Sequence, residues 1–270
     1  MRQQLGLDRP WLEQYGLFLK RLVVGDEHGW PGFGISFQSR EPVLDGLAER
    51  LPQTLALALG AGVLWLVLGV GIGVAAAVRR RTLVDRAALG FSLLGVSAPV
   101  FLVGLLSLFL FWKTLGWLPG TGYVPFSESP REWFLHLVQP WLVLALLFAA
   151  SYARMTRASL LDALGEDFVR TARAKGLSER RVVWRHGLRA GLALIVTMLG
   201  MDLALLVGGA VVTEKVFNLQ GVSSWAVDAA LGQDLPPVVA VTLVGAAAIV
   251  VASLIVDLAY AWLDPRVRLA

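Results

Sequence analysis

The sequence contains no cysteine, and only three of its 270 residues are histidine. The lack of cysteine excludes disulfide frameworks, thiolate zinc sites, iron–sulfur clusters and cysteine nucleophiles. The histidines His28, His136 and His186 lie in three separate segments, so no shared metal site is expected.

Catalytic and nucleotide-binding patterns are missing as well. No stretch reads G-x-x-x-x-G-K-[ST], so the chain does not bind ATP through a P-loop of its own. No layer of the chain combines paired carboxylates, or a nucleophile with its base. Charged residues make up only 16%, and a formal net charge of +4 is too small to indicate a nucleic-acid partner. We therefore expect a non-enzymatic chain without a cofactor.

Apolar residues, in contrast, are abundant. They make up 56% of the chain, and ten residues are tryptophan, which gathers at membrane interfaces. About 20 predominantly apolar residues are needed to span a hydrocarbon core of roughly 30 Å. Five stretches that are nearly free of Lys and Arg reach that length: 54–78, 87–112, 134–153, 188–213 and 238–263. They predict an all-α polytopic membrane protein with five transmembrane helices.

The basic residues divide the connecting segments into two groups. Most of the 24 Lys and Arg follow the first and third predicted spans or end the chain. By the positive-inside rule these segments, including the tail 264–270, are cytoplasmic. The segments 113–132 and 214–237 carry few cations and are expected outside. We therefore expect a multi-pass protein of the bacterial cytoplasmic membrane with a cytoplasmic C-terminus.

The N-terminal region 1–53 is expected to be an external, mostly polar cap before the transmembrane domain 54–263. The helical spacing of Leu12, Tyr15, Leu19 and Leu22 predicts a short amphipathic helix, either at the membrane surface or packed against the bundle. Nothing ahead of this region would start its translocation. We therefore expect that an earlier span is missing, through truncation or a start codon assigned too far downstream.

Three features inside the predicted spans have alternative interpretations. Pro99 is expected to kink the second span, which either shapes a translocation path or accommodates a neighbouring helix. Asp202, in the fourth span, either lines the pathway or is satisfied by a neighbouring helix. Gly69 and Gly73 have the spacing that permits close helix packing, although 28 glycines make chance matches common.

The most distinctive stretch is the predicted cytoplasmic loop 161–190. Residues 165–176 predict a short helix, with Glu166 and Asp167 in its first turn and Gly176 as its stop, at a position that requires positive φ. We expect Phe168, Val169 and Ala172 on one face. We also expect an ion pair between Glu166 and Arg170 on the other face. Ser178 then begins a second helical segment over 179–186.

These residues resemble a known family. Residues 166–177, EDFVRTARAKGL, are similar to the cytoplasmic EAA loop of ABC importer permeases, in the form found in the dipeptide, oligopeptide and nickel branch. Further resemblances follow in order along nearly the whole chain: LGLDRP at 5–10, RLPQTL at 50–55, GWLP at 116–119, TEKVF at 213–217 and DPRVR at 264–268. Family members carry one more membrane helix ahead of the LGLD region, which gives six.

The resemblance implies the ABC importer permease fold and a subunit that switches access by alternating conformations. Its implied partners are ABC ATPase subunits, a second permease subunit, an external substrate-binding protein and membrane lipid. Peptides are the implied cargo, with nickel complexes, glutathione or other small solutes left open. Residues 165–176 would form the coupling helix that contacts an ATPase subunit, through Glu166, Asp167, Phe168, Arg170, Thr171, Ala172, Arg173, Ala174 and Gly176. The alternative is a stand-alone secondary carrier or channel that uses its basic loop only for orientation.

Overall fold

The chain folds into a helical bundle, shown by a computed structural model that describes residues 10–263, apart from the side chains of 193, 207–209 and 260–263. The predicted tail 264–270 lies outside the described residues. In the described part the only β-structure is two isolated bridges. The helices are α1 (Trp11–Val24), α2 (Val43–Val78), α3 (Leu83–Ser97), α4 (Val100–Ser107), η1 (Leu108–Thr114), α5 (Pro130–Gly165), α6 (Asp167–Ala174), α7 (Glu179–Arg181), η2 (Val182–Gly187), α8 (Leu188–Gly209), α9 (Val211–Val216), α10 (Val222–Leu231) and α11 (Leu235–Leu263).

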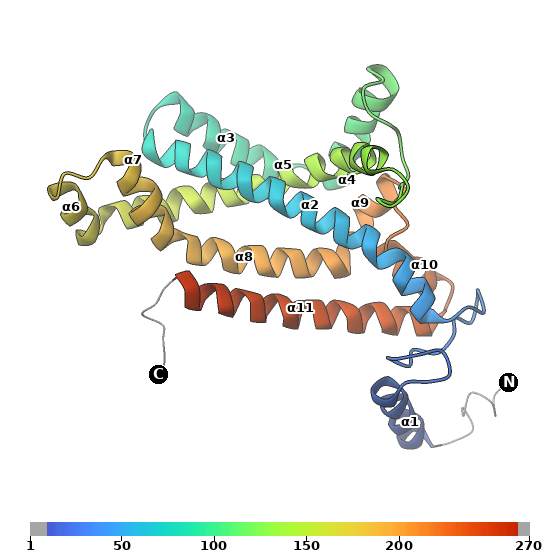
Figure 1. The fold of residues 1–270 in the computed structure, drawn as a ribbon. Helices are drawn as coiled ribbons and strands as arrows, with labels where there is room; N and C mark the ends of the chain where they lie inside the picture. The colour runs from blue at the N-terminus through green and yellow to red at the C-terminus, as the bar shows by residue number, and fades with distance from the viewer. Residues whose placement is uncertain (1–9, 264–270) are drawn as a thin grey trace.

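Three helices are long and apolar enough to cross a membrane as single rods, namely α2, α5 and α11. Two further crossings are possible if bent helix pairs count as one span each, so the described residues carry up to five. Figure 1 shows α6 and α7 at one end of the bundle and α9 and α10 at the other. The segments predicted to be cytoplasmic and external therefore separate to opposite ends.

The helices α2 and α5 form the centre of the bundle because small residues let them approach closely. A Cβ atom added to Gly73 would lie 2.6 Å from the carbonyl oxygen of Ala153. One added to Gly69 would meet the side chain of Tyr152 and lie 3.1 Å from the carbonyl oxygen of Ala149. The packing interpretation of the Gly69 and Gly73 spacing is confirmed. The aromatic rings of Trp65 and Phe148 stack across the same interface, with centroids 4.6 Å apart.

The second predicted span, 87–112, is not one straight helix. It breaks between α3 and α4 and bends by 101° at Ala98–Pro99. The reason is local, since a proline has no backbone N–H for the helical ladder and restricts the residue before it to extended conformations. Ala98 is accordingly extended, with ψ of 126°. The prediction of a kink is confirmed, but its size makes this span two separate helices.

The start of α3 is tied to α5 by a two-point ion pair. Arg157 donates from Nε to Oδ1 of Asp85 over 2.5 Å and from Nη2 to Oδ2 over 2.9 Å. The backbone N–H of Arg81 also donates to Asp85, over 2.9 Å. Asp85 is almost fully buried. This contact fixes the α2–α3 turn to the part of α5 that leads into α6.

Candidate functional site

The predicted coupling segment, residues 165–176, folds as expected. Helix α6 occupies Asp167–Ala174, and Gly176 has φ of +75°. The N–H of Gly176 donates to the carbonyl of Arg173 over 2.9 Å, and that of Leu177 to the carbonyl of Ala172 over 3.3 Å. These bonds close the helix end around a left-handed residue, as in helices that stop at a glycine. The predicted positive φ at Gly176 is confirmed.

One face of α6 is covered by the chain itself. Val169 and Ala172 are buried and pack with Val182 of η2, against Leu164 and Leu177. Phe168, Val169 and Ala172 fall within about 100° of the helix circumference, as expected, but the chain itself covers Val169 and Ala172 and leaves Phe168 exposed at the edge of this face. Ala172 is therefore a packing residue of α6, although the sequence places it among the predicted coupling residues.

The remaining surface of α6 is open. Phe168 is 45% exposed, an apolar ring on an otherwise polar helix surface. Arg170 pairs with Asp167 at 3.2 Å, so the predicted Glu166–Arg170 pair is wrong. Arg173 forms two hydrogen bonds with Glu179 of α7, at 2.7 and 3.1 Å. The exposed residues among those predicted for coupling are Glu166, Asp167, Phe168, Arg170, Thr171, Arg173, Ala174 and Gly176.

The two candidate pathway residues occupy different elements. Pro99 lies at the break between α3 and α4. Asp202 lies on α8, half-buried, and accepts a hydrogen bond of 2.7 Å from the hydroxyl of Tyr152 on α5. The structure does not bring these two residues together with α6. It does place a polar contact between α5 and α8 inside the bundle.

A buried carboxylate that the sequence interpretation missed organises the end of the bundle opposite α6. Glu214 of α9 is 0% exposed. It accepts hydrogen bonds from the Thr54 hydroxyl of α2 over 2.6 Å and from the Ser224 N–H over 2.7 Å. Thr54 in turn accepts the N–H of Val222 over 3.0 Å. These acceptors satisfy the free N–H groups in the first turn of α10, as a helix N-terminus requires. We call Glu214, Thr54, Val222 and Ser224 the outer network.

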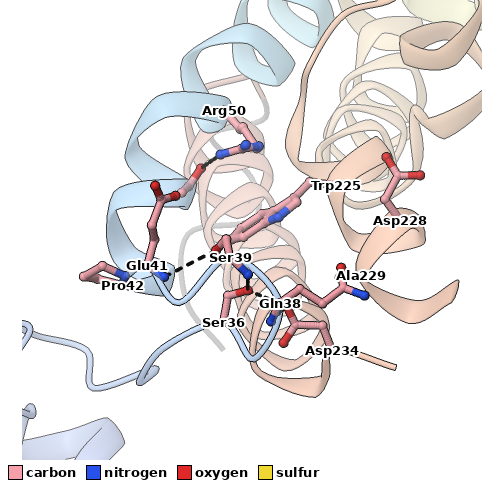
Figure 2. Close-up of a pocket in the computed structure, with 11 residues that line it drawn as sticks. Ser36, Gln38, Ser39, Glu41, Pro42, Arg50, Trp225, Asp228, Ala229 and Asp234 are labelled. Atoms are coloured by element: carbon pink, nitrogen blue, oxygen red, sulfur yellow. Dashed lines mark hydrogen bonds between the residues drawn. The ribbon is translucent and has the colours of Figure 1, made fainter. Parts of the chain in front are cut away.

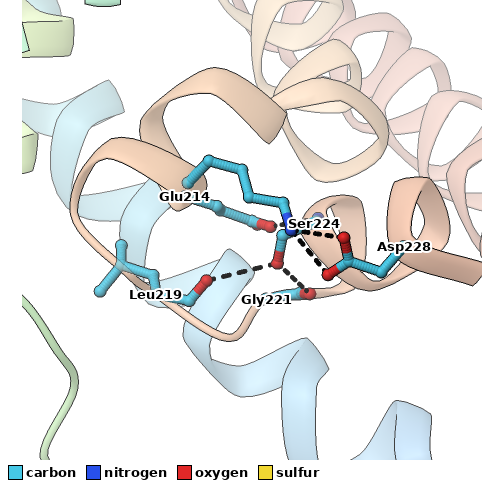
Figure 3. Close-up of polar contacts among 6 residues, drawn as sticks. Glu214, Leu219, Gly221, Ser224 and Asp228 are labelled. Carbon is cyan, nitrogen blue, oxygen red and sulfur yellow. Dashed lines mark hydrogen bonds and ion pairs between the residues drawn. The ribbon is translucent and has the colours of Figure 1, made fainter. Parts of the chain in front are cut away.

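Figure 3 shows how closely the loop before α10 wraps around this carboxylate. The Ser224 hydroxyl donates to the carbonyl of Gly221 over 3.0 Å, and Lys215 pairs with Asp228 at 2.6 Å on the exposed side. A Cβ atom on Gly221 would collide with the Glu214 carboxylate. The available sequence pattern was a glutamate directly after an apolar run, with a glycine and two serines downstream. That pattern does not reveal burial.

Burial raises the pKa of Glu214 above the ordinary glutamate value, and hydrogen bonds from Thr54, Ser224 and the Ser223 backbone oppose the shift. A raised pKa means that the folded protein keeps the proton at a pH where the unfolded chain has lost it. The stability linked to this group is therefore complete below the unfolded pKa, about 4.3. It is lost as the pH rises through the folded value.

We accordingly expect the thermal stability of the detergent-solubilised protein to fall as the pH rises from the ordinary glutamate pKa toward neutrality. Glu214→Gln, which cannot ionise, should show a flatter dependence of melting temperature on pH. Asp228→Asn removes an exposed carboxylate nearby and is the control, with an unchanged slope. Equal slopes for the wild type and Glu214→Gln would contradict the assignment.

A small pocket of about 110 Å³ lies next to the outer network (Figure 2). The loop before α2, the start of α2 and helix α10 line it, and the guanidinium of Arg50 stands 4.9 Å from the Trp225 ring centroid. Asp234 accepts from the Ser36 hydroxyl over 2.5 Å and from the Phe37 N–H over 2.8 Å. These bonds anchor the N-terminal loop to the turn between α10 and α11.

Two family models match this chain. The binding-protein-dependent transport system inner membrane component matches residues 69–269, and the N-terminal part of such a membrane component matches residues 1–58. A putative peptide transport system permease protein of Brucella abortus is 41% identical over 268 residues, which cover 99% of this chain and 83% of the relative. The glutathione transport system permease protein GsiC of Escherichia coli K12 is 39% identical over 268 residues, which cover 99% of this chain and 83% of that protein.

Solved structures agree on the fold. The inward-facing MetNI methionine ABC transporter has a chain similar to this one with a TM-score of 0.66 at 19% identity, covering 83% of this chain and 99% of that one. An amino acid ABC transporter crystallised with histidines has a TM-score of 0.58 at 16% identity, over 80% of this chain and 92% of that one.

The fold and these matches define a class, the membrane-spanning permease subunits of ABC importers. The chain belongs to the binding-protein-dependent transport system inner membrane component family. The resemblance found in the sequence is therefore confirmed, and the comparisons support an importer permease rather than a stand-alone carrier or channel.

Proposed function

We propose that this chain takes no part in ATP chemistry and converts the movement of partner ATPase subunits into alternating access for a peptide or a related small solute. The observation that carries the proposal is α6, a short helix closed at Gly176 and fastened by Val169 and Ala172 to the bundle, with Phe168 left exposed. A displacement applied to such a rigid element passes into α5 and η2 instead of being absorbed by a frayed end. The proposed partners are those of the class, namely two ATPase subunits, a second permease and an external binding protein.

The cargo proposal rests on the relatives, which are named for peptide and glutathione transport. The experiment is reconstitution of the complex that purifies with this chain, in liposomes that contain the binding protein. We expect a P-loop ATPase to copurify and labelled peptide uptake to require ATP. Uptake driven by an ion gradient in the absence of any ATPase would overturn the proposal and favour a secondary carrier.

The proposed pathway passes the Pro99 break and the polar contact at Asp202. The support is that Pro99 breaks the second span and that Asp202 is a half-buried carboxylate on α8. The hydrogen bond from Tyr152 equally supports the alternative, in which Asp202 joins α5 to α8. Metal ions and further cofactors have no part in the proposal.

The proposed orientation places α6 and the tail 264–270 in the cytoplasm and α9, α10 and region 1–53 outside. Because the chain has no cysteine, single cysteine variants report accessibility without background. Gly221 has no room for a side chain, so Gln220→Cys and Glu128→Cys are the external probes and Arg80→Cys and Lys175→Cys the cytoplasmic ones. An impermeant maleimide added to intact cells should label only the first pair. Labelling of Lys175→Cys from outside would reverse the orientation.

A further inference from the structure

Helix α1 (Trp11–Val24) carries an apolar face that nothing in the described structure covers. None of its residues is buried. Its exposed large apolar side chains are Trp11 at 74%, Leu12 at 63%, Tyr15 at 58%, Leu19 at 40%, Val23 at 72% and Val24 at 70%. At about 100° per residue the first five of these positions fall within one third of the helix circumference, and Val24 lies outside it. Glu13 and Lys20 lie on the opposite side.

The helix is held in place although it stands apart from the bundle. The carbonyl of Arg21 accepts hydrogen bonds from the N–H groups of Gly25 and Gly32, at 2.7 and 3.2 Å. The indole N–H of Trp30 donates to the carbonyl of Val23 over 2.9 Å. The loop that follows is tied to the bundle by Asp234 through Ser36 and Phe37. These hydrogen bonds therefore hold α1 at a fixed position along the long axis of the bundle.

Helix α1 lies near the end of the bundle that carries α10 and the beginning of α11 (Figure 1). The adjoining helices expose apolar surface there as well. Leu55 and Leu59 of α2 are 37% and 58% exposed, and Leu235 at the start of α11 is 65% exposed. In the most apolar 18-residue stretch of α11, only 17% of the residues are buried within the chain. Helix α1 thus lies at the end of a bundle whose spans themselves expose apolar surface.

We propose that α1 lies in the membrane–water interface, with Trp11, Leu12, Tyr15, Leu19 and Val23 in the lipid and Lys20 and Arg21 toward the phosphate headgroups. Trp and Tyr concentrate at this depth because their rings have an apolar body and a polar edge. Trp30, 70% exposed at the end of the same segment, adds a third such ring. The occupant of the apolar face is the phospholipid bilayer. A second permease, a binding protein or residues 1–9 would each need to cover the same side chains instead.

The test uses the assembled importer in phospholipid nanodiscs, with nitroxide labels on single cysteines. Tyr15→Cys and Leu19→Cys probe the apolar face, and Glu13→Cys and Lys20→Cys are matched controls on the polar face. Oxygen partitions into lipid and a nickel chelate stays in water, so the ratio of their collision rates reports depth. We expect this ratio to be several-fold higher at positions 15 and 19 than at 13 and 20.

Two results would overturn the proposal. Equal, water-like ratios on both faces would mean that α1 stands in solution. Strong immobilisation at 15 and 19 with low collision rates for both reagents would mean that protein covers the face.

A second measurement needs no labels. Lipids brominated in the upper acyl chain should quench the tryptophan fluorescence of the wild type more than that of Trp11→Phe, and equal quenching counts against the proposal. Both readouts report depth whichever way the bundle is oriented, so they are independent of the topology experiment.

Discussion

Phe168→Asp is expected to release the ATPase from the purified complex and to abolish ATP-dependent uptake, while the permease itself still inserts and folds. Phe168 is the one large apolar side chain exposed on α6. Aromatic anchors at protein interfaces cost about 2 kcal/mol or more when they are removed. A loss of that size weakens the affinity roughly 30-fold. The measurement is ATPase retention on an affinity-tagged permease, together with peptide-stimulated ATP hydrolysis.

Two further variants separate docking from folding of the coupling segment. Phe168→Tyr keeps the ring and should retain most of the ATPase. Ala172→Glu places a charge against Val182 and Leu177, so it should disorder the segment and lower the melting temperature of the isolated permease. Phe168→Asp should leave that melting temperature unchanged. If Phe168→Asp retains the ATPase and transports normally, α6 does not couple through this face.

Gly73→Leu is expected to destabilise the whole bundle. The Cβ atom of the added side chain would lie 2.6 Å from the Ala153 carbonyl oxygen and 2.6 Å from the Thr156 Cβ. Both atoms belong to α5, a long helix that cannot move aside locally. Overpacking in a closely packed core typically costs about 1–3 kcal/mol. We expect a lower melting temperature and less folded protein in the membrane, measured by fluorescence-detected gel filtration of a fluorescent fusion.

Gly71→Leu is the matched control, because it lies on the same helix and has no atom within 4 Å of an added Cβ. It adds the same apolar volume and the same gain in helix propensity, but on an open face. The two variants should therefore differ clearly. Equal melting temperatures would show that the spacing of Gly69 and Gly73 has no role in holding α2 against α5.

The sequence predicted the apolar spans and the short helix α6 well, because each depends on neighbouring residues. A run of about 20 apolar residues is a sufficient signature of a span. The end of α6 at Gly176 follows from a glycine after a short amphipathic stretch, since other residues avoid positive φ. The spans were nevertheless shorter than the helices observed. α2 begins at Val43 and α5 extends to Gly165, because polar residues prolong a helix beyond the membrane once it is nucleated.

Other features depended on contacts between distant residues, and no local pattern contained them. The outer network joins Thr54 to Glu214, which are 160 positions apart, and Ser36 meets Asp234 across 198 positions. Glu214 is therefore buried and hydrogen-bonded although its neighbours in sequence predict an exposed loop.

The sequence by itself thus determined how many apolar segments the chain has, how its positive charges are distributed and where helix α6 stops. Those properties are set by composition and by backbone preferences over a few residues. Only the tertiary structure decided which face of α6 is free, how sharply the chain bends at Pro99 and which carboxylate organises the end opposite α6. Each of these depends on what packs against the residue, and in this bundle the packing partner comes from another helix.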